Sequence, residues 1–268
     1  MNFTQHLRVK PGHKLKLADW DAGATLGFEK DKAQDLLAKN TRRLAALQTR
    51  LYAESRRAVL IVLQGMDASG KDGTVAHVMG GVNPQGCRVT SFKAPTTEER
   101  AHDFLWRIHK AVPARGEIGI FNRSHYEDVL IVRVHNLVPE KVWSGRYRQI
   151  NDFEALLLAS GVQILKFFLH IDKDEQRDRL QARLEDPTKN WKFNPGDLEE
   201  RKLWKDYQRA YEDALRQCST PAAPWFIIPA NKKWFRNLAV SQIIVETLEK
   251  LDPQFPPPVA GLSKIVIR

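Results

Sequence analysis

The sequence predicts an α/β fold in which helices cover both faces of a parallel sheet of five strands. Short apolar runs, typical of strands buried on both faces, alternate with segments of helical length along most of the chain. A glycine-rich turn follows the most apolar of these runs and precedes a helical segment, which is the order found at phosphate-binding loops. The 268 residues suit one such domain with a short extension at each end.

Five strands and seven helices make up the expected domain. The predicted strands are residues 58–64, 87–92, 117–122, 162–171 and 225–228. Helices are predicted between and after them at residues 71–80, 97–111, 139–160, 173–186, 197–217 and 234–250. A further amphipathic helix is expected before the first strand, over residues 29–56, where leucines recur near the helical period of about 3.6 residues.

The expected domain spans residues 29–255 and has an extension on either side. Residues 1–28 carry several basic side chains and show no hydrophobic period, so we interpret them as an extended arm. Residues 256–268 form a C-terminal tail, because four prolines follow Leu251 and exclude a regular helix there.

The balance of charge favours an anionic ligand. The chain has 42 Lys and Arg residues against 32 Asp and Glu residues, a formal net charge of +10 at pH 7. Such an excess attracts nucleic acid, acidic lipid or a phosphate-rich substrate, although it also serves solubility alone. Two cysteines are too few for a disulfide framework, and no apolar stretch of about 18 residues occurs. We therefore expect a soluble, cytoplasmic protein that does not bind membranes.

The glycine-rich turn is the strongest motif of the chain. Gly65, Gly70 and Lys71 fit the pattern G-x-x-x-x-G-K between a strand and a helix. Backbone N–H groups there can surround phosphate oxygens at the positive end of a helix, and Lys71 adds a positive charge. The alternative is a glycine-rich turn with no ligand. The expected phosphate-binding residues of this loop are Ala68, Ser69, Gly70, Lys71, Asp72, Gly73 and Thr74.

Two carboxylates lie in or beside this loop. Asp72 stands where the pattern usually has a Ser or Thr that binds Mg²⁺, and Asp67 lies inside the loop. A carboxylate so close to bound phosphates would repel them unless it holds a hard cation or accepts a proton. We assign Asp67 to the metal or to proton transfer, with an Asx turn as the alternative. Asp72 is expected to interact with the positive end of the following helix.

A second polar cluster follows the strand at residues 117–122. Ligands of open parallel sheets bind beyond the carboxyl ends of the strands, so Asn122, Arg123, Glu127 and Asp128 should face Lys71. Arg123 can bridge two phosphate oxygens and stabilise charge during transfer. Asp128 is the second candidate metal ligand, and Glu127 is a further candidate both for the metal and for catalysis. The alternative is a plain acidic pair at the start of a helix.

Three other polar residues lie near these motifs. Lys93 leaves a strand end and is a candidate phosphate contact, with a surface position as the alternative. Arg133 is a further candidate phosphate contact. His125 is expected to be structural, because phosphoryl transfer rarely needs a proton carrier.

Residues 177–197 are expected to form a basic lid. Arg179 and Arg183 are four residues apart and share one face of a helix, while Lys189 and Lys192 flank a tryptophan in the following loop. A lid at this place would close over the substrates and exclude water from the phosphoryl group. The alternative is a solvated helix and loop.

Together these segments resemble the polyphosphate kinase 2 family over residues 30–255. The resemblance rests on GMDASGKDGT, FKAPTTEERAHDFLWR, FNRSHYEDV and RLEDPTKNWKFNPGDLEERKLWKDYQRAYEDAL. It implies a three-layer P-loop kinase fold similar to thymidylate kinase, Mg²⁺ dependence with Mn²⁺ as an alternative ion, and phosphoryl transfer between inorganic polyphosphate and nucleotides. By position it assigns the phosphate-loop role to Asp67, Gly70 and Lys71, the second site to Asn122, Arg123 and Asp128, and the lid to Arg179, Arg183, Lys189 and Lys192.

The sequence of the second cluster points to one branch of that family. Many members have Asp-Arg-Ser-Trp-Tyr-Asn-Arg where this chain has Asn-Arg-Ser-His-Tyr-Glu-Asp at 122–128, which is similar to the branch that phosphorylates both AMP and ADP. We therefore expect reversible conversion of AMP to ADP and of ADP to ATP. By analogy with the family, we also expect a homo-oligomer, either a dimer or a tetramer. An ATP-dependent kinase of a nucleotide or small metabolite is the alternative, followed by a non-catalytic nucleic-acid-binding protein.

Overall fold

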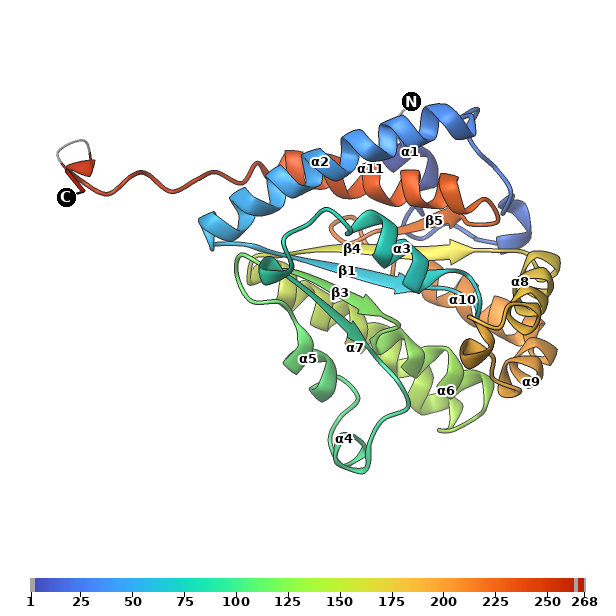
Figure 1. Cartoon of the computed structure of the whole chain (residues 1–268). Helices are drawn as coiled ribbons and strands as arrows, with labels where there is room; N and C mark the ends of the chain where they lie inside the picture. The colour runs from blue at the N-terminus through green and yellow to red at the C-terminus, as the bar shows by residue number, and fades with distance from the viewer. Residues whose placement is uncertain (1–2, 263–264, 268) are drawn as a thin grey trace.

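The computed structural model describes residues 3–262 and 265–267, and over these residues it has one sheet of five parallel strands (Figure 1). The strands are β1 (Ala58–Gln64), β2 (Cys87–Ser91), β3 (Ile118–Asn122), β4 (Val162–His170) and β5 (Trp225–Pro229). Their spatial order is β2-β3-β1-β4-β5. The predicted α/β class and all five predicted strands are confirmed.

Helices cover both faces of this sheet and its carboxyl edge. They are α1 (Phe3–Leu7), α2 (Lys30–Glu54), α3 (Lys71–Val78), α4 (Thr97–Ala101), α5 (Trp106–Ala111), α6 (Ile131–Val134), α7 (Glu140–Ala159), α8 (Lys173–Glu185), α9 (Gly196–Lys202), α10 (Trp204–Gln217) and α11 (Lys233–Leu251). Short 3₁₀ turns are η1 (Leu17–Asp19), η2 (Pro84–Gly86), η3 (His125–Val129) and η4 (Asn190–Lys192).

The alternation of side chains along β1 explains the three layers. Side chains of a strand point to opposite faces in turn, and every residue of β1 is buried. Val59 and its alternate neighbours pack in one core with α2 and α11, whereas Leu60 and Val62 pack in the other with α7 and α10. Figure 1 shows α2 and α11 side by side above the sheet and α7 below it.

The N-terminal segment differs from the predicted extended arm. Residues 3–7 form α1, with Phe3 and Leu7 buried, and the Val9 N–H donates to the Trp225 carbonyl at 2.8 Å. Arg8 forms an isolated antiparallel bridge with Phe226 of β5. The prediction was wrong here because the apolar side chains of this short segment cover the sheet edge at β5. The first two residues of the expected arm lie outside the described residues.

Two predicted helices are each divided in the structure, and the C-terminal tail is extended. The segment 97–111 splits into α4 and α5 because the Asp103 carboxylate accepts the Leu105 N–H at 2.9 Å and starts a turn. The segment 197–217 splits into α9 and α10. Figure 1 shows the tail after α11 running away from the body of the protein. Among the described residues, we find no helix long and apolar enough to cross a membrane.

The parallel register brings the ends of the strands to one edge. Leu63 of β1 pairs with Asn122 of β3, so the loops that follow these two strands start side by side. Helices α8 and α9 lie at this same edge, beyond the arrowheads in Figure 1. The fold therefore places the predicted phosphate loop, the second polar cluster and the lid segment in one region.

Candidate active site

The loop after β1 has the backbone that a phosphate-binding loop needs. Gly65 has φ +154° and Gly70 has φ +99°, values that side-chain-bearing residues rarely adopt. A Cβ on Gly65 would lie 2.7 Å from the Leu169 carbonyl oxygen, and one on Gly70 would lie 1.9 Å from the Arg236 guanidinium. Gly65 is therefore required by space and by conformation, and Gly70 by its backbone conformation.

Lys71 begins α3 and folds back over this loop. Its Nζ donates to the Gly65 carbonyl at 2.8 Å, and the side chain is buried. Burial and the nearby charge of Arg123 lower the pKa of Lys71 below its ordinary value. The Ser69 hydroxyl is also buried in the loop and has no hydrogen-bond partner within the protein. These donors suit the oxygen atoms of a phosphate group.

Two hydrogen bonds join the phosphate loop to the second polar cluster. Arg123 Nη2 donates to Asp67 Oδ1 at 2.9 Å, and Asn122 Nδ2 donates to Asp72 Oδ1 at 2.7 Å. Arg123 has φ +62°, a left-handed conformation that is strained for a residue with a side chain. The two predicted clusters therefore meet, and a strained backbone aims Arg123 at Asp67.

The adjacent carboxylates of η3 face different neighbours. Burial raises the pKa of Glu127, while Arg123 and Lys71 oppose this shift, so Glu127 lies among the charged groups of the phosphate loop. Asp128 instead accepts a hydrogen bond from Arg146 Nη1 at 2.9 Å. The structure thus brings Glu127, rather than Asp128, toward Asp67.

We expect Asp128→Asn to change how stability depends on pH. Burial raises the pKa of Asp128 to about 6 from its ordinary 3.8, so between these values the folded protein holds a proton that the unfolded chain has released. The stability that this group contributes is therefore full below about pH 4 and falls as the pH rises toward about 6. Urea unfolding of both proteins across this range should give a wild-type minus variant difference that declines with pH. A difference in the free energy of unfolding that stays constant with pH would contradict a raised pKa of Asp128.

The donor set fits a hard divalent cation that shares its coordination with substrate. Among residues 3–262 and 265–267, no group of three or more His, Cys, Asp or Glu side chains is arranged to enclose a metal. Asp67 is nonetheless close enough to Glu127 for its charge to contribute to the raised pKa of Glu127. Mg²⁺ is commonly held by one or two carboxylates, waters and the substrate phosphates, and this pair offers such a half-site.

Arg179 holds the phosphate loop from behind. Its Nη1 donates to the carbonyls of Ala68 and Ser69, each at 2.9 Å, and its Nη2 donates to those of Ala230 and Asn231. Its Nε donates to a glutamate one turn earlier in α8. Because all of these donors are engaged, Arg179 serves as a fixed support of the loop and differs from the mobile lid residue that the sequence suggested.

The rest of the predicted lid lies over the site. Lys192 Nζ is 3.7 Å from an oxygen of Asp72, and Arg183 pairs with Asp197 at 3.3 Å. Burial and the neighbouring charge of Asp67 raise the pKa of Asp197, which places this lid carboxylate near the phosphate loop. Lys189 pairs with an aspartate of its own segment and is largely exposed.

Lys93 and Arg133 lie in other surroundings. Lys93 lines an open cavity of about 500 Å³ beside the edge strand β2, together with Arg107 and Lys110. Arg133 of α6 donates to Asp213 at 2.8 Å and to the Tyr147 hydroxyl at 3.0 Å. Neither residue has a hydrogen bond or ion pair with the phosphate loop among its described contacts.

Arg236 was not assigned to the phosphate site from the sequence. It lies in the first turn of α11, is buried, and reaches the Ser69 carbonyl at 3.4 Å. Burial and the nearby Arg179 lower its pKa to about 10. Among the residues that the structure describes, its only hydrogen-bonding side-chain partner is the neutral Asn237, so its charge is available to an anion on the loop. An arginine in the first helical turn after the last strand is the signal that could have indicated it.

Comparison with known proteins shows the family to which this chain belongs. Residues 27–256 match the family described as Polyphosphate kinase 2, which is most of the chain. The chain belongs to the polyphosphate kinase 2 family. The predicted resemblance is thereby confirmed, and the active-site loops described above lie within the matched residues.

Close relatives of this polyphosphate kinase 2 member extend over nearly its full length. An AMP/ADP-polyphosphate phosphotransferase of Meiothermus ruber is 58% identical over 97% of this chain and 98% of its own. An ADP-polyphosphate phosphotransferase of Rhodopseudomonas palustris is 48% identical over 94% of this chain and 92% of its own. The crystal structure of polyphosphate kinase 2 from Arthrobacter aurescens TC1 superposes with a TM-score of 0.95, at 46% identity, and covers 98% of this chain and 95% of that chain.

Proposed function

We propose that this protein transfers the terminal phosphoryl group between inorganic polyphosphate and nucleotides, converting AMP to ADP and ADP to ATP reversibly. The observation that carries the proposal is the meeting of two loops at one edge of the sheet, where Lys71 and Arg123 flank the carboxylates of Asp67 and Glu127. The relative that is most similar among those described above is named as acting on both AMP and ADP, which supports the choice of acceptors.

The charged residues supply what phosphoryl transfer requires. During the step, the bond between the terminal phosphorus of polyphosphate and its bridging oxygen breaks, and a phosphate oxygen of the nucleotide bonds to that phosphorus. Positioning and charge neutralisation account for most catalysis of this kind. Lys71 and Arg123 neutralise the charge on the oxygens of the transferring group. Asp67 and Glu127 would hold Mg²⁺, which neutralises phosphate charge when it is bound.

A group of cationic side chains beside the phosphate loop suits the binding of a long anionic donor. Lys233 has a lowered pKa because it is partly buried and close to Arg179 and Arg236, with Lys189 contributing a smaller effect. The mutual repulsion of these groups is relieved when a polyanion lies among them. We propose that the chain of the donor, beyond its terminal phosphate, runs past Lys233 and Arg236.

The lid keeps water out of the site in this proposal. Water would compete with the nucleotide for the phosphoryl group, so a closed lid favours transfer over hydrolysis. Lys192 contacts Asp72 at the start of α3, which holds the lid loop against the phosphate loop. Arg183 of α8 and Asp197 of α9 form an ion pair that connects these two helices of the lid.

The direct test supplies purified protein with ADP, Mg²⁺ and long-chain polyphosphate and measures ATP. ATP should accumulate as polyphosphate is shortened, and AMP should yield ADP under the same conditions. Replacing polyphosphate by ATP, with nucleoside monophosphates as acceptors, serves as the control for an ordinary ATP-dependent kinase. Activity that appears only with ATP as donor would reject the proposal.

Salt should weaken the enzyme for polyphosphate far more than for nucleotide. Several cations contact the long donor, and binding of a polyanion releases condensed counterions, so its affinity falls steeply with salt. Between about 50 mM and about 200 mM KCl, the KM for long polyphosphate should rise at least ~10-fold, while the KM for ADP changes by ~3-fold or less. Steady-state kinetics with each substrate varied in turn provide the measurement. Parallel changes of both KM values would count against an extended donor site.

We also propose a homo-oligomer, a dimer or tetramer, located in the cytoplasm. Both cysteines, Cys87 and Cys218, are free, which suits a reducing compartment. Light scattering of the purified chain would measure its mass in solution and decide between one copy and several.

A further inference from the structure

The loop that carries Arg123 and Glu127 is attached to the core through a buried charged cluster. Lys166 lies in the middle of β4 and is fully buried, as is Glu154 of α7 beside it. Lys166 Nζ donates to Glu154 Oε2, to the Tyr126 hydroxyl at 3.0 Å and to the Cys218 carbonyl at 2.6 Å. All three protons of this ammonium group are therefore used inside the protein.

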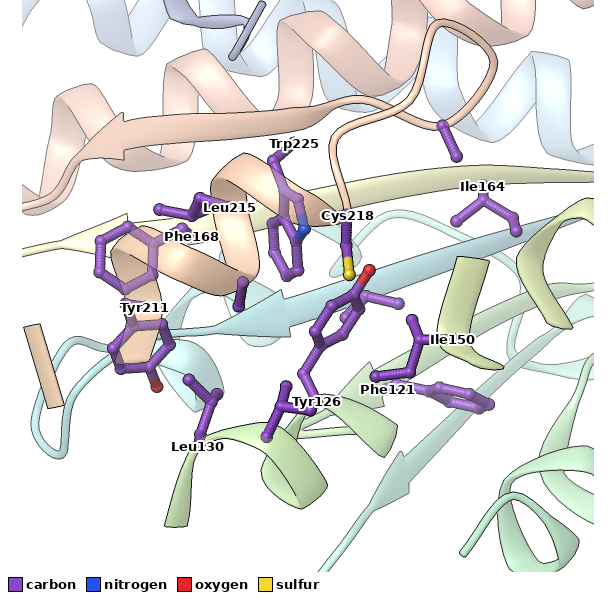
Figure 2. Close-up of a cluster of buried hydrophobic side chains, with 14 of the residues drawn as sticks. Phe121, Tyr126, Leu130, Ile150, Ile164, Phe168, Tyr211, Leu215, Cys218 and Trp225 are labelled. Atoms are coloured by element: carbon purple, nitrogen blue, oxygen red, sulfur yellow. The ribbon is translucent and has the colours of Figure 1, made fainter. Parts of the chain in front are cut away.

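Tyr126 connects this ion pair to the site. Its hydroxyl donates to Glu154 Oε1 at 2.8 Å, which closes a ring of hydrogen bonds with Lys166. Figure 2 shows the Tyr126 hydroxyl directed to Cys218, with Trp225 next to the Tyr126 ring. The centroids of the Tyr126 and Trp225 rings are 4.7 Å apart in an edge-to-face arrangement. His125 Nε2 also contacts Glu154 at 3.3 Å. We refer to Glu154, Lys166 and Tyr126 as the buried brace.

The buried brace acts on the centre of a short segment whose ends face the substrates. Ser124 and Tyr126 are completely buried, whereas Arg123 and Glu127, on either side of them, reach the phosphate loop. The Ser124 hydroxyl accepts a hydrogen bond from Gln64 at the end of β1. The segment is thus fixed from two sides, and this over-determination can maintain the left-handed backbone of Arg123.

A buried ion pair is a poor way to gain stability, because removing two charges from water costs about as much as their attraction returns. An apolar cluster of the same size would serve the core equally well. We propose that the buried brace is a positioning device. Glu154, Lys166 and Tyr126 fix the position and orientation of segment 123–127 relative to the phosphate loop, so that Arg123 and Glu127 contact the transferring phosphoryl group. The inference rests on the proposed function for its kinetic consequences, and not for its structural ones.

The first test is Tyr126→Phe, which removes one hydroxyl and keeps the ion pair and the ring. Loss of this link should lower kcat about 10-fold and change either KM by ~3-fold or less, because misplacement of a catalytic group acts on the transition state. Replacing the whole cluster by Glu154→Met, Lys166→Met and Tyr126→Phe together should keep cooperative thermal unfolding and lower kcat about 100-fold. A folded variant with kcat within ~2-fold of wild type would overturn the proposal.

Two comparisons separate positioning from a general structural role. Glu54→Gln with Arg57→Met removes a partly buried ion pair at the other end of the sheet and should leave kcat within ~2-fold of wild type. In an Arg123→Ala background, Tyr126→Phe should cost less than the ~10-fold expected in the wild type, since one of the two groups that it positions is already absent. An undiminished loss in that background would contradict the inference.

A structural measurement does not depend on the donor or on turnover. In a crystal structure of the Tyr126→Phe variant, the Arg123–Asp67 hydrogen bond, 2.9 Å in the wild type, should be lost or lengthened beyond hydrogen-bonding distance. An unchanged bond would contradict the inference even if the wild type proved inactive toward polyphosphate. Inactivity of the wild type, by contrast, would reject the proposed function alone.

Discussion

Arg123→Ala should lower kcat about 10³-fold with polyphosphate as donor, while the protein remains folded. An arginine that stabilises the charge of a transferring phosphoryl group is typically worth this much or more. Arg123 is suited to the role because Glu127 and Asp67 keep its pKa above the ordinary value despite its burial, and because its guanidinium already reaches the phosphate loop. Initial rates at saturating ADP and polyphosphate would measure the effect.

A matched arginine serves as the control for that experiment. Arg216 lies on the outer surface of α10, where it pairs with Asp213. Arg216→Ala should leave kcat within ~2-fold of wild type, because surface ion pairs contribute little. If Arg123→Ala retained more than a tenth of the wild-type rate, Arg123 would have no place in charge stabilisation.

Glu127→Gln should lower kcat at least ~100-fold, whereas Asp128→Asn should lower it ~5-fold or less. The glutamine keeps the shape of Glu127 and removes the charge that would hold the divalent cation beside Asp67. Asp128 is engaged with Arg146 and lies among different neighbours, so its neutralisation alters stability more than chemistry.

The two substitutions are at adjacent positions, and the activity of each variant as a function of Mg²⁺ concentration distinguishes them most clearly. Glu127→Gln should need a higher Mg²⁺ concentration for half-maximal activity, and Asp128→Asn should follow the wild-type curve. If instead Asp128→Asn needed more Mg²⁺ and Glu127→Gln followed the wild-type curve, Asp128 would be the metal ligand, as predicted from the sequence, and Glu127 would have no role in the site.

The phosphate loop and the order of the elements could be predicted from the sequence because both depend on local rules. Gly65 and Gly70 are required by backbone conformation, and apolar runs of strand length identify the sheet. The N-terminal segment was mistaken for an arm, since nothing local shows that Phe3 and Leu7 cover the edge of β5.

Which neighbour of a polar pair faces the site could not be predicted. Glu127 and Asp128 follow each other in a 3₁₀ turn, so their side chains point in different directions, and only the packing of η3 decides which one meets Asp67. Arg236 comes from the far end of the chain and is placed by the sheet. Lys166 did leave a signal, because a lysine inside the apolar run of β4 needs a buried partner.

The most direct measurement is a crystal structure of the wild type with ADP, Mg²⁺ and aluminium fluoride, which imitates a phosphoryl group during transfer. We predict that the fluoride group lies between the Lys71 ammonium and the Arg123 guanidinium, with Mg²⁺ on the side of Asp67 and Glu127. The proposed mechanism would be contradicted by a fluoride group bound elsewhere, such as in the cavity beside β2, while Lys71 still contacts Gly65 and Arg123 still contacts Asp67.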